Sequence, residues 1–273
     1  MKNKVKDLFN LEKKTIIIAG GAGQIGFSMC EAILSYGARV IVIDLDIENA
    51  KNKAQLLSKK YRENLFYYKL DISKYQDVEL LFNKISKEFK TIDGLVNCFH
   101  YKGNPRKLDY SENFFNSLEN FPIDVWDKVH DVNLKGTFLA CREFSKIIDC
   151  KKGGVIVNIS STYGNVSPNK NIYKGTNLNS PIAYASSKSA IINLSRYLAV
   201  YLSDKNIRVN TLSPGGVYNN QEKEFIKNYE KLTPMGRMAH PEDYQGSIIF
   251  LLSDASSYMT GSNLIVDGGW TAW

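Results

Sequence analysis

The chain has 273 residues, of which 44% are hydrophobic, 23% charged and 12% aromatic, and its formal net charge at pH 7 is +7. This composition is typical of a packed globular protein and excludes a disordered, collagen-like or disulfide-stapled chain. The basic residues are scattered and mostly lysine, which favours a solvated surface over a nucleic-acid site. A modest electrostatic attraction for an anionic substrate or a dinucleotide stays open.

Cysteine spacing and apolar segments indicate the compartment. Cys30, Cys98, Cys141 and Cys150 form no Cys-x-x-Cys motif, which favours reduced thiols. The lysines near the start lead into no apolar leader segment, and no apolar run approaches the roughly 18 residues of a spanning helix. We therefore expect a soluble, cytoplasmic protein with no membrane partner.

Short β-branched runs alternate with longer segments of helical period, which predicts a parallel sheet covered by helices on both faces. The expected strands are Thr15–Ala19, Val40–Asp44, Leu65–Leu70, Gly94–Asn97, Val155–Ser160, Arg208–Ser213 and Leu264–Val266. The expected helices are Ile25–Tyr36, Ile47–Tyr61, Val78–Phe89, Val125–Ile148, Ala183–Leu202 and Pro241–Leu252. No repeat or linker divides the chain, so we predict one doubly wound α/β domain over residues 1–273.

Three stretches lack a clear period, and long loops in a compact domain tend to be functional. Residues 101–122 and 165–181 are interpreted as insertions near a substrate site, and residues 215–239 as a mobile loop that follows a strand.

The first predicted strand leads into GGAGQIG at residues 20–26 and then into a helix. Gly20 or Gly21 permits a tight turn, Gly23 lets the backbone approach a pyrophosphate, and Gly26 allows close helix–strand packing. The helix start, at Gln24 and Ile25, offers unpaired N–H groups to phosphates. Glycine turns also serve plain structure, but this position between strand and helix predicts a dinucleotide site.

Two acidic residues at strand ends refine the cofactor prediction. Asp44, about 20 residues past the glycines, is expected to bind the adenosine ribose and repel a 2′-phosphate; a helix cap is the alternative. No Arg or Lys lies in the turn or directly after Asp44, which favours NAD(H) over NADP(H). Asp71, next to Ile72, is predicted to contact adenine, although helix capping by Asp71 or Ser73 is nearly as good an interpretation.

Tyr184 and Lys188 are four residues apart in a predicted helix and therefore share one face. A tyrosine with its usual pKa near 10 is a poor acid–base catalyst at neutral pH, but a nearby ammonium lowers that pKa. This spacing is common by itself. Ser160 and Ser161 strengthen it, because they end a strand where side chains open onto the ligand crevice.

With these motifs in hand, the chain resembles the short-chain dehydrogenase/reductase family over roughly residues 11–270. The matching motifs, in order, are the glycine turn, Asp44, Asp71, Leu95-Val96-Asn97, Asn133, Ile159-Ser160-Ser161, Tyr184-Ala185-Ser186-Ser187-Lys188, Arg208-Val209-Asn210, Pro214-Gly215 and Val266-Asp267-Gly268-Gly269. The resemblance implies a single-domain Rossmann fold and an NAD-dependent oxidoreductase.

The resemblance also implies roles for single residues. Tyr184 would be the general acid or base, and Lys188 would lower its pKa and bind the nicotinamide ribose. Ser161 would orient the reacting oxygen. Asn133 would hold a water that links Lys188 to solvent. A role as a helix-kink residue is the alternative, and it is compatible with the first because the relay depends on the kink.

On the cofactor side, the resemblance implies that Asn97 borders the nicotinamide. Pro214 and Gly215 would shape the loop against it, with Val217 offering backbone contacts to its carboxamide.

Several positions depart from the family pattern. Gln24 replaces a usual glycine, the Asn-Asn-Ala-Gly motif reads NCFH at residues 97–100, and Asn219 replaces a frequent threonine. Whether Gln24, Cys98 and Asn219 alter cofactor binding stays open. The spacing between Ser161 and Tyr184 is about ten residues longer than is common in the family, which predicts that the insertion reshapes the substrate mouth.

Histidines and polar loops bear on other ligands. His100, His130 and His240 are far apart and form no helical pair, which argues against a metal site, although His100 could line the active site. Lys102 and Arg106, with the Asn- and Tyr-rich loops, suit a hydroxylated, anionic small molecule as well as they suit plain solvation.

In its insertion, in Cys98 and in its Pro-Gly-Gly loop, the chain is similar to flagellin-modification oxidoreductases linked to nonulosonic acid (legionaminic-type) biosynthesis. That similarity implies a sugar phosphate or nucleotide sugar as substrate.

Alternatives remain. A 3-oxoacyl-carrier-protein reductase would suit the charge of +7, but Asp44 argues against its usual NADPH. A non-catalytic NAD-binding regulatory protein is the alternative from another class. The family resemblance also implies a homodimer or homotetramer built through the helices at Val125–Ile148 and Ala183–Leu202, with no nucleic-acid partner.

Overall fold

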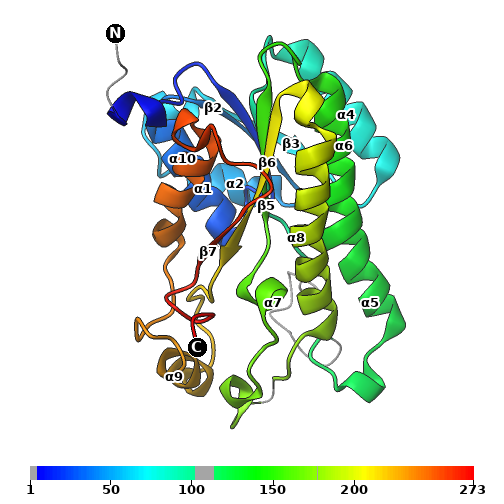
Figure 1. Ribbon diagram of the computed structural model, residues 1–273, viewed down its shortest axis with the longest axis vertical. Coiled ribbons are helices and arrows are strands. Elements are labelled where there is room, and N and C mark those ends of the chain that lie inside the picture. Colours follow the sequence, from blue (N-terminus) through cyan, green and yellow to red (C-terminus); the bar gives the residue numbers. More distant parts are fainter. Residues whose placement is uncertain (1–4, 102–113, 177) are drawn as a thin grey trace.

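The computed structural model describes residues 5–101, 114–176 and 178–273. Over this part of the chain, seven strands form one parallel sheet in the order β3-β2-β1-β4-β5-β6-β7 (Figure 1). The strands are β1 (Thr15–Ala19), β2 (Arg39–Asp44), β3 (Leu65–Lys69), β4 (Gly94–Asn97), β5 (Gly154–Ile159), β6 (Ile207–Pro214) and β7 (Asn263–Val266). The predicted doubly wound single domain is confirmed.

Helices connect the strands and cover the sheet. The α-helices are α1 (Gln24–Ser35), α2 (Ile47–Ala54), α3 (Lys59–Arg62), α4 (Tyr75–Glu88), α5 (Ile123–His130), α6 (Gly136–Ile147), α7 (Thr162–Asn165), α8 (Ile182–Tyr201), α9 (Lys223–Lys231) and α10 (Gln245–Leu252). A π-helical segment, η3 (Asp131–Lys135), joins α5 to α6. The 3-10 segments are η1 (Val5–Phe9), η2 (Leu118–Asn120), η4 (Lys170–Tyr173), η5 (Ser203–Lys205), η6 (Pro241–Tyr244) and η7 (Asp254–Ser256).

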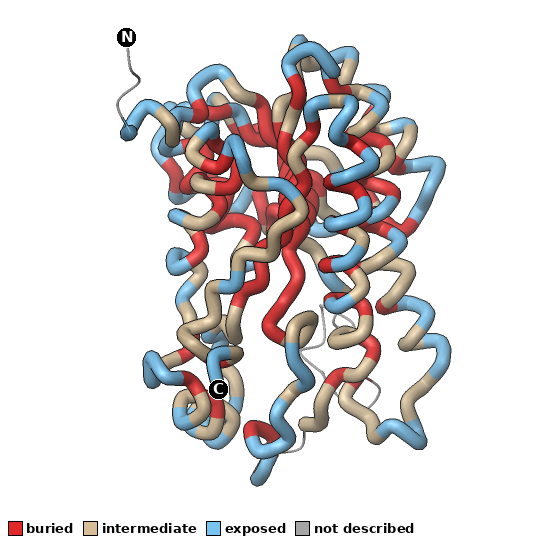
Figure 2. Tube along the Cα trace, viewed as in Figure 1, coloured by how far each residue is buried: buried red, intermediate tan, exposed pale blue. Residues whose placement is uncertain are grey.

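The period of two in the strands divides the core between the two faces of the sheet. In β1, Ile16 and Ile18 pack with the cluster formed by α1, α2 and α10, whereas Ile17 packs with the cluster of α4, α6 and α8. Both faces are therefore apolar, as continuous hydrophobic strands require. The buried residues run through the centre of the molecule (Figure 2).

The order of the strands locates the ligand crevice. From β1 the chain proceeds to one side through β2 and β3, then returns to β4 on the other side, so the order reverses between β1 and β4. In such sheets ligands bind at the carboxyl ends of the strands beside this reversal. The segments that follow β5 and β6, including α7 and α9, extend beyond that end of the sheet (Figure 1).

Three sequence expectations are corrected. The helix predicted at Ile47–Tyr61 is two helices, because the chain turns at residues 55–58 and α3 begins anew after Ser58. The helix predicted at Val125–Ile148 is interrupted by the π segment around Asn133. Residues 215–239 are not all loop, since α9 buries Tyr229.

Candidate active site

The glycines after β1 form a turn that only glycine can make. Gly20 has φ +85°, and a Cβ there would lie 2.6 Å from the backbone of Cys98. A Cβ on Gly26 would lie 2.2 Å from the carbonyl oxygen of Gly20. Gly23 is the N-cap of α1, so the first N–H groups of this 12-residue helix face the crevice. The turn therefore fits a dinucleotide pyrophosphate.

Gln24, at a usual glycine position, links two loops. Its amide Nε2 donates a 2.8 Å hydrogen bond to the carbonyl oxygen of Tyr218, in the segment after β6. The next residue, Ile25, is partly buried and packs against the apolar core on the sheet face that α1 covers. The substitution thus connects the glycine turn to the opposite rim of the crevice.

Asp44 ends β2 beside the glycine turn. Its Oδ2 accepts a 2.9 Å hydrogen bond from the backbone N–H of Ala22, and its Oδ1 accepts one from Asp46. The carbonyl oxygen of Ala22 accepts hydrogen bonds from Lys53 Nζ at 2.7 Å and from Asn49 Nδ2 at 3.0 Å. The sequence motif does not reveal Lys53, because this residue lies in α2, beyond both the turn and the position after Asp44. The helical register of α2 returns this lysine to the turn.

Asp71 makes the local hydrogen bonds with Ser73 that the capping interpretation predicts. Its Oδ1 accepts hydrogen bonds from the backbone N–H and the hydroxyl of Ser73, at 3.0 and 2.6 Å. Ile72 between them is buried, and a Cβ on Gly136 would lie 3.0 Å from its side chain. A contact with adenine stays a prediction for this pair.

Tyr184, Lys188 and Ser161 come together at the carboxyl end of β5. Tyr184 and Lys188 lie one turn apart near the start of α8, and the Lys188 ammonium nitrogen is 5.7 Å from the centroid of the Tyr184 ring. Ser161 is the N-cap of α7 and interacts with the Tyr184 hydroxyl by a hydrogen bond. The fold therefore assembles the three side chains that can orient and exchange a proton.

Burial dominates the electrostatics of this group. Burial raises the pKa of Tyr184, and the hydrogen bond with Ser161 opposes that rise. Burial lowers the pKa of Lys188 from 10.5 to about 8. The charge of Lys188 is not among the causes that set the pKa of Tyr184. The expectation that Lys188 lowers this pKa stays a prediction.

Asn133 lies buried in the π segment. Its Oδ1 accepts a 2.8 Å hydrogen bond from the N–H of Tyr101, and its Nδ2 donates a 2.9 Å hydrogen bond to Ser187 Oγ. Ser187 Oγ in turn donates to the carbonyl oxygen of Tyr184. These bonds fix the segment after β4 against the first turn of α8. The relay toward Lys188 stays a prediction.

The segment after β4 departs from the family motif. Asn97 turns its amide into the core, where Nδ2 donates a 2.8 Å hydrogen bond to Asn158 Oδ1 of β5. The N–H of Cys98 donates to the carbonyl oxygen of Ala19. Burial raises the pKa of the Cys98 thiol to about 12, so it stays neutral near Lys188.

The segment after β6 is supported by α9. Gly216 N–H donates a 2.6 Å hydrogen bond to Tyr229 Oη, and Gly215 N–H donates to Val266. Just beyond, the carbonyl oxygen of Val217 accepts a hydrogen bond from Gln221, whose Oε1 accepts one from Asn219 N–H. Pro214, Gly215 and Val217 thus lie at and just beyond the carboxyl end of β6, and their contacts with the nicotinamide stay predictions.

An aromatic cluster joins the second insertion to α9 and the chain end. Tyr173 Oη lies 3.2 Å from Tyr163 Oη, and Tyr229 stacks on Trp270 with ring centroids 4.4 Å apart. Ile172 and Met238 complete its buried part. The insertion therefore forms a structured wall beside Tyr184. Lys102 and Arg106 lie outside the described residues.

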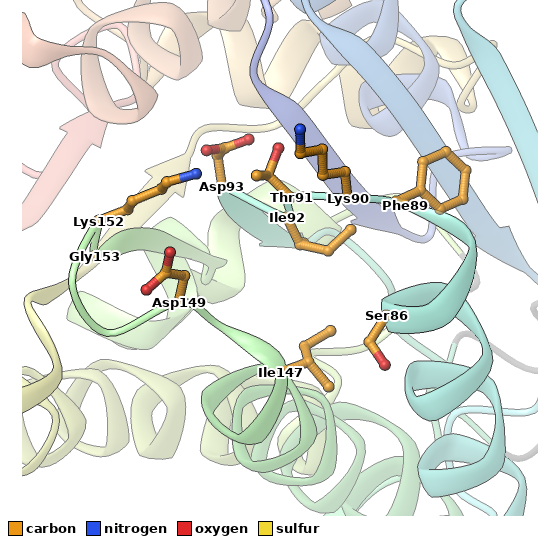
Figure 3. Close-up of a pocket in the computed structure, with 10 residues that line it drawn as sticks. All are labelled: Ser86, Phe89, Lys90, Thr91, Ile92, Asp93, Ile147, Asp149, Lys152 and Gly153. Atoms are coloured by element: carbon orange, nitrogen blue, oxygen red, sulfur yellow. The ribbon is translucent and has the colours of Figure 1, made fainter.

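A small hollow lies at the opposite end of the strands, where β4 and β5 begin (Figure 3). Its volume is about 60 Å³, and its wall includes Asp93, whose carboxylate accepts a hydrogen bond from the N–H of Thr15. It is remote from the Tyr184 site and is interpreted as structural. Within the described ranges, no acidic, histidine or cysteine cluster could hold a metal ion, and no helix could cross a bilayer.

Comparison with known proteins finds a family model and relatives that match nearly the whole chain. A family model described as Enoyl-(Acyl carrier protein) reductase matches residues 20–271. The chain is 32% identical to post-translational flagellin modification protein A of Campylobacter coli, over 95% of this chain and 99% of that one. It is 31% identical to the NAD-dependent glycerol dehydrogenase of Listeria innocua, over 96% of both chains.

Two further comparisons bear on cofactor and substrate. The chain is 32% identical to the 3-oxoacyl-[acyl-carrier-protein] reductase FabG of Chlamydia muridarum, over 95% of this chain and 98% of that one. The crystal structure of a short-chain dehydrogenase from Leptospira borgpetersenii, with bound NAD+, superposes with a TM-score of 0.81. It is 34% identical and covers 99% of this chain and 96% of its own.

Proposed function

The chain belongs to the short-chain dehydrogenase/reductase family, and from this premise we propose that it transfers a hydride between NAD(H) and a hydroxyl or ketone carbon of a sugar. The observation that carries the proposal is the group formed by Tyr184, Lys188 and Ser161 at the carboxyl end of β5. A phenol, a buried ammonium and a hydroxyl at this edge are suited to proton exchange with a carbonyl or alcohol oxygen.

The three side chains have separate tasks in this proposal. Ser161 Oγ donates a hydrogen bond to the reacting oxygen, and Tyr184 gives that oxygen a proton in reduction or takes one in oxidation. Lys188 stabilises the phenolate that forms when the proton leaves Tyr184. The raised pKa of Tyr184 keeps the proton in place at neutral pH, which is the form that reduction needs. The nicotinamide, when bound, supplies or accepts the hydride.

NAD(H) is proposed as the cofactor because Asp44 lies beside the glycine turn. A carboxylate there accepts hydrogen bonds from ribose hydroxyls and repels a 2′-phosphate. The NAD+ bound to the Leptospira relative agrees with this preference. Lys53 opposes it, since a cation at Ala22 reduces that repulsion.

A sugar substrate is supported by the polar and aromatic wall around Tyr184 and by the relatives. Tyrosine hydroxyls and rings suit a ligand with several hydroxyl groups. One relative carries the name of a flagellin modification protein and another that of a glycerol dehydrogenase. We therefore propose a sugar phosphate or nucleotide sugar used for flagellin or surface glycans, and action in the cytoplasm.

A second candidate is a 3-oxoacyl-carrier-protein reductase. It is favoured by the similarity to the Chlamydia reductase and by the net charge of +7, which would attract an acidic carrier protein. Asp44 disfavours the NADPH that this activity usually takes. A non-catalytic NAD-binding protein would have no need for the complete group at Tyr184.

Assembly as a homodimer or homotetramer is proposed through α8 and the neighbouring α5–α6 helices. Tyr197, Val200 and Tyr201 of α8 are exposed on one side of that helix, and the rings of Tyr197 and Tyr201 stack. An apolar exposed stripe of this kind is typical of a surface that packs against another copy.

The test compares cofactors, substrates and one variant. NADH and NADPH are titrated by fluorescence, and turnover is measured with sugar phosphates, nucleotide sugars, free polyols and an acetoacetyl thioester. We expect tighter NADH binding and turnover of a sugar. Tyr184→Phe should abolish turnover and leave NADH binding within about twofold. Retained turnover in that variant would contradict the mechanism, and turnover of the thioester alone would favour the second candidate.

A further inference from the structure

We infer that His100 determines substrate specificity by binding a hydroxyl group on the carbon next to the reacting carbon. This inference rests on the proposed function and refines its substrate class to vicinal diols and α-hydroxy ketones. It starts from one contact, in which the His100 ring meets the Tyr184 ring edge-on, with centroids 5.6 Å apart and planes at 73°.

The backbone around His100 is fixed, which gives its ring a defined place. His100 follows β4 by a few residues, and the N–H of the next residue, Tyr101, is held by Asn133 Oδ1 at 2.8 Å. Asn133 is itself buried and is bonded to α8 through Ser187. The bonds that hold the start of α8 therefore also hold the backbone next to His100.

The two rings differ in exposure. Tyr184 is only partly exposed, whereas His100, whose ring contacts the phenol, is exposed to solvent. In this inference, a substrate whose reacting oxygen meets the Tyr184 hydroxyl approaches past the exposed imidazole. Its neighbouring carbon then passes the imidazole, which can donate or accept a hydrogen bond at neutral pH.

Other polar side chains of the crevice make contacts of their own. Ser161 is committed to the reacting oxygen and to the N–H of Tyr163. Tyr163 and Tyr173 pair with each other at 3.2 Å, and Tyr229 accepts the N–H of Gly216. The imidazole at His100 adds a polar group to the entry side of the phenol, where the family motif has a glycine.

The experiment uses two alcohols that differ only in the neighbouring hydroxyl, butane-2,3-diol and butan-2-ol, with NAD+ and the full-length protein. The matched variants are His100→Gln, which keeps a hydrogen-bond donor, and His100→Leu, which keeps bulk without one. We expect His100→Leu to lower the diol-to-alcohol ratio of kcat/KM about tenfold, mainly through KM of the diol, as for one lost hydrogen bond. His100→Gln should keep most of the ratio.

An unchanged ratio in His100→Leu, or equal ratios in the two variants, would overturn the inference and leave His100 as a packing partner of Tyr184. Binding of the diol is also measured by ligand-observed NMR with NADH in the Tyr184→Phe background, with and without His100→Leu. About tenfold weaker diol binding supports the inference even if no alcohol is turned over, and equal binding overturns it. Absence of turnover with every sugar and alcohol would instead count against the proposed function.

Discussion

The ammonium group of Lys188 donates a 2.7 Å hydrogen bond to the carbonyl oxygen of Ile159, the last residue of β5. One residue further, Ser160 Oγ donates a 2.7 Å hydrogen bond to the carbonyl oxygen of Lys188. The end of β5 and the first turns of α8 are therefore bonded in both directions. This pairing holds Lys188 in a buried position, where its charge costs stability.

Replacing Lys188 with Met is expected to raise the free energy of unfolding at pH 7 by about 2 kcal/mol and to abolish turnover. Lowering the pKa of Lys188 from 10.5 to about 8 corresponds to a cost of about 3 kcal/mol for the charged form. The variant also loses the hydrogen bond to the Ile159 carbonyl oxygen, which offsets about 1 kcal/mol of this gain in stability. Denaturant unfolding of both proteins measures the difference. Equal or lower stability of the variant at pH 7 would contradict the buried charge.

The same substitution has a defined pH dependence. The unfolded chain keeps the Lys188 proton up to the ordinary pKa of 10.5, whereas the folded chain releases it near 8. Between these values unfolding takes up a proton, so this group makes the wild type more stable as the pH rises. The difference in free energy of unfolding between Lys188→Met and the wild type should therefore shrink from pH 8 upward. Taking the difference between the two proteins removes the titration of the buried cysteines and tyrosines that they share.

Asp44→Ala is expected to lower kcat/KM with NAD at least about tenfold and to raise it with NADP, because the carboxylate that repels a 2′-phosphate is gone. The gain with NADP should depend on Lys53, whose ammonium stays at the carbonyl oxygen of Ala22. Asp44→Ala with Lys53→Ala should therefore lose that gain. Steady-state kinetics with both cofactors measure these ratios.

Asp46→Ala is the matched control for this prediction. Asp46 is a carboxylate two positions away whose Oδ1 caps α2 by accepting the N–H of Asn49 at 3.2 Å. Its removal should reduce stability by about 1 kcal/mol and leave the cofactor ratio unchanged. A cofactor ratio that shifted equally in Asp46→Ala would assign the effect to α2 rather than to Asp44.

The sheet could be predicted from sequence because buried parallel strands are continuous apolar runs that few other structures tolerate. All seven strands were placed within about two residues of their observed ends. The helix α9 was missed because Phe225, Ile226 and Tyr229 give too short an apolar stripe to stand out from a polar segment. The π segment at Asn133 leaves no mark on a period read over whole helices, because it adds only one residue to a helical turn. A kink there was expected from the family resemblance and not from the periodicity.

The residues of the candidate site also fall into those that the sequence reveals and those whose contacts depend on the fold. Tyr184, Lys188 and Ser161 were found because helical spacing and strand ends are visible in sequence. The contacts of Lys53 and Gln24 were not, because each depends on how two segments distant in sequence meet in the fold. The raised pKa of Tyr184 was missed for a related reason. The spacing to Lys188 reveals a neighbouring charge but gives no measure of burial.

Tyr229→Phe is expected to destabilise the protein by about 1–2 kcal/mol and to raise KM for NADH. The phenol oxygen accepts the N–H of Gly216 at 2.6 Å, and a phenyl ring leaves that N–H without its partner. The segment after β6, which forms one rim of the crevice, is then less well fixed. Tyr258→Phe is the control, since Tyr258 is fully exposed and should change neither quantity. An unchanged KM for NADH in Tyr229→Phe would show that this hydrogen bond in the segment after β6 does not contribute to cofactor binding.

Gly26→Ala and Gly246→Ala form a matched pair within two helices. A Cβ at Gly26 would lie 2.2 Å from the carbonyl oxygen of Gly20, so the turn must open. We expect a loss of more than about 2 kcal/mol in stability and of measurable NADH binding, by denaturant unfolding and fluorescence titration. Gly246, in α10, has nothing within 4 Å of its added Cβ, and alanine there should stabilise by up to about 1 kcal/mol with unchanged NADH affinity. Normal NADH binding in Gly26→Ala would mean that the glycine turn does not hold the pyrophosphate.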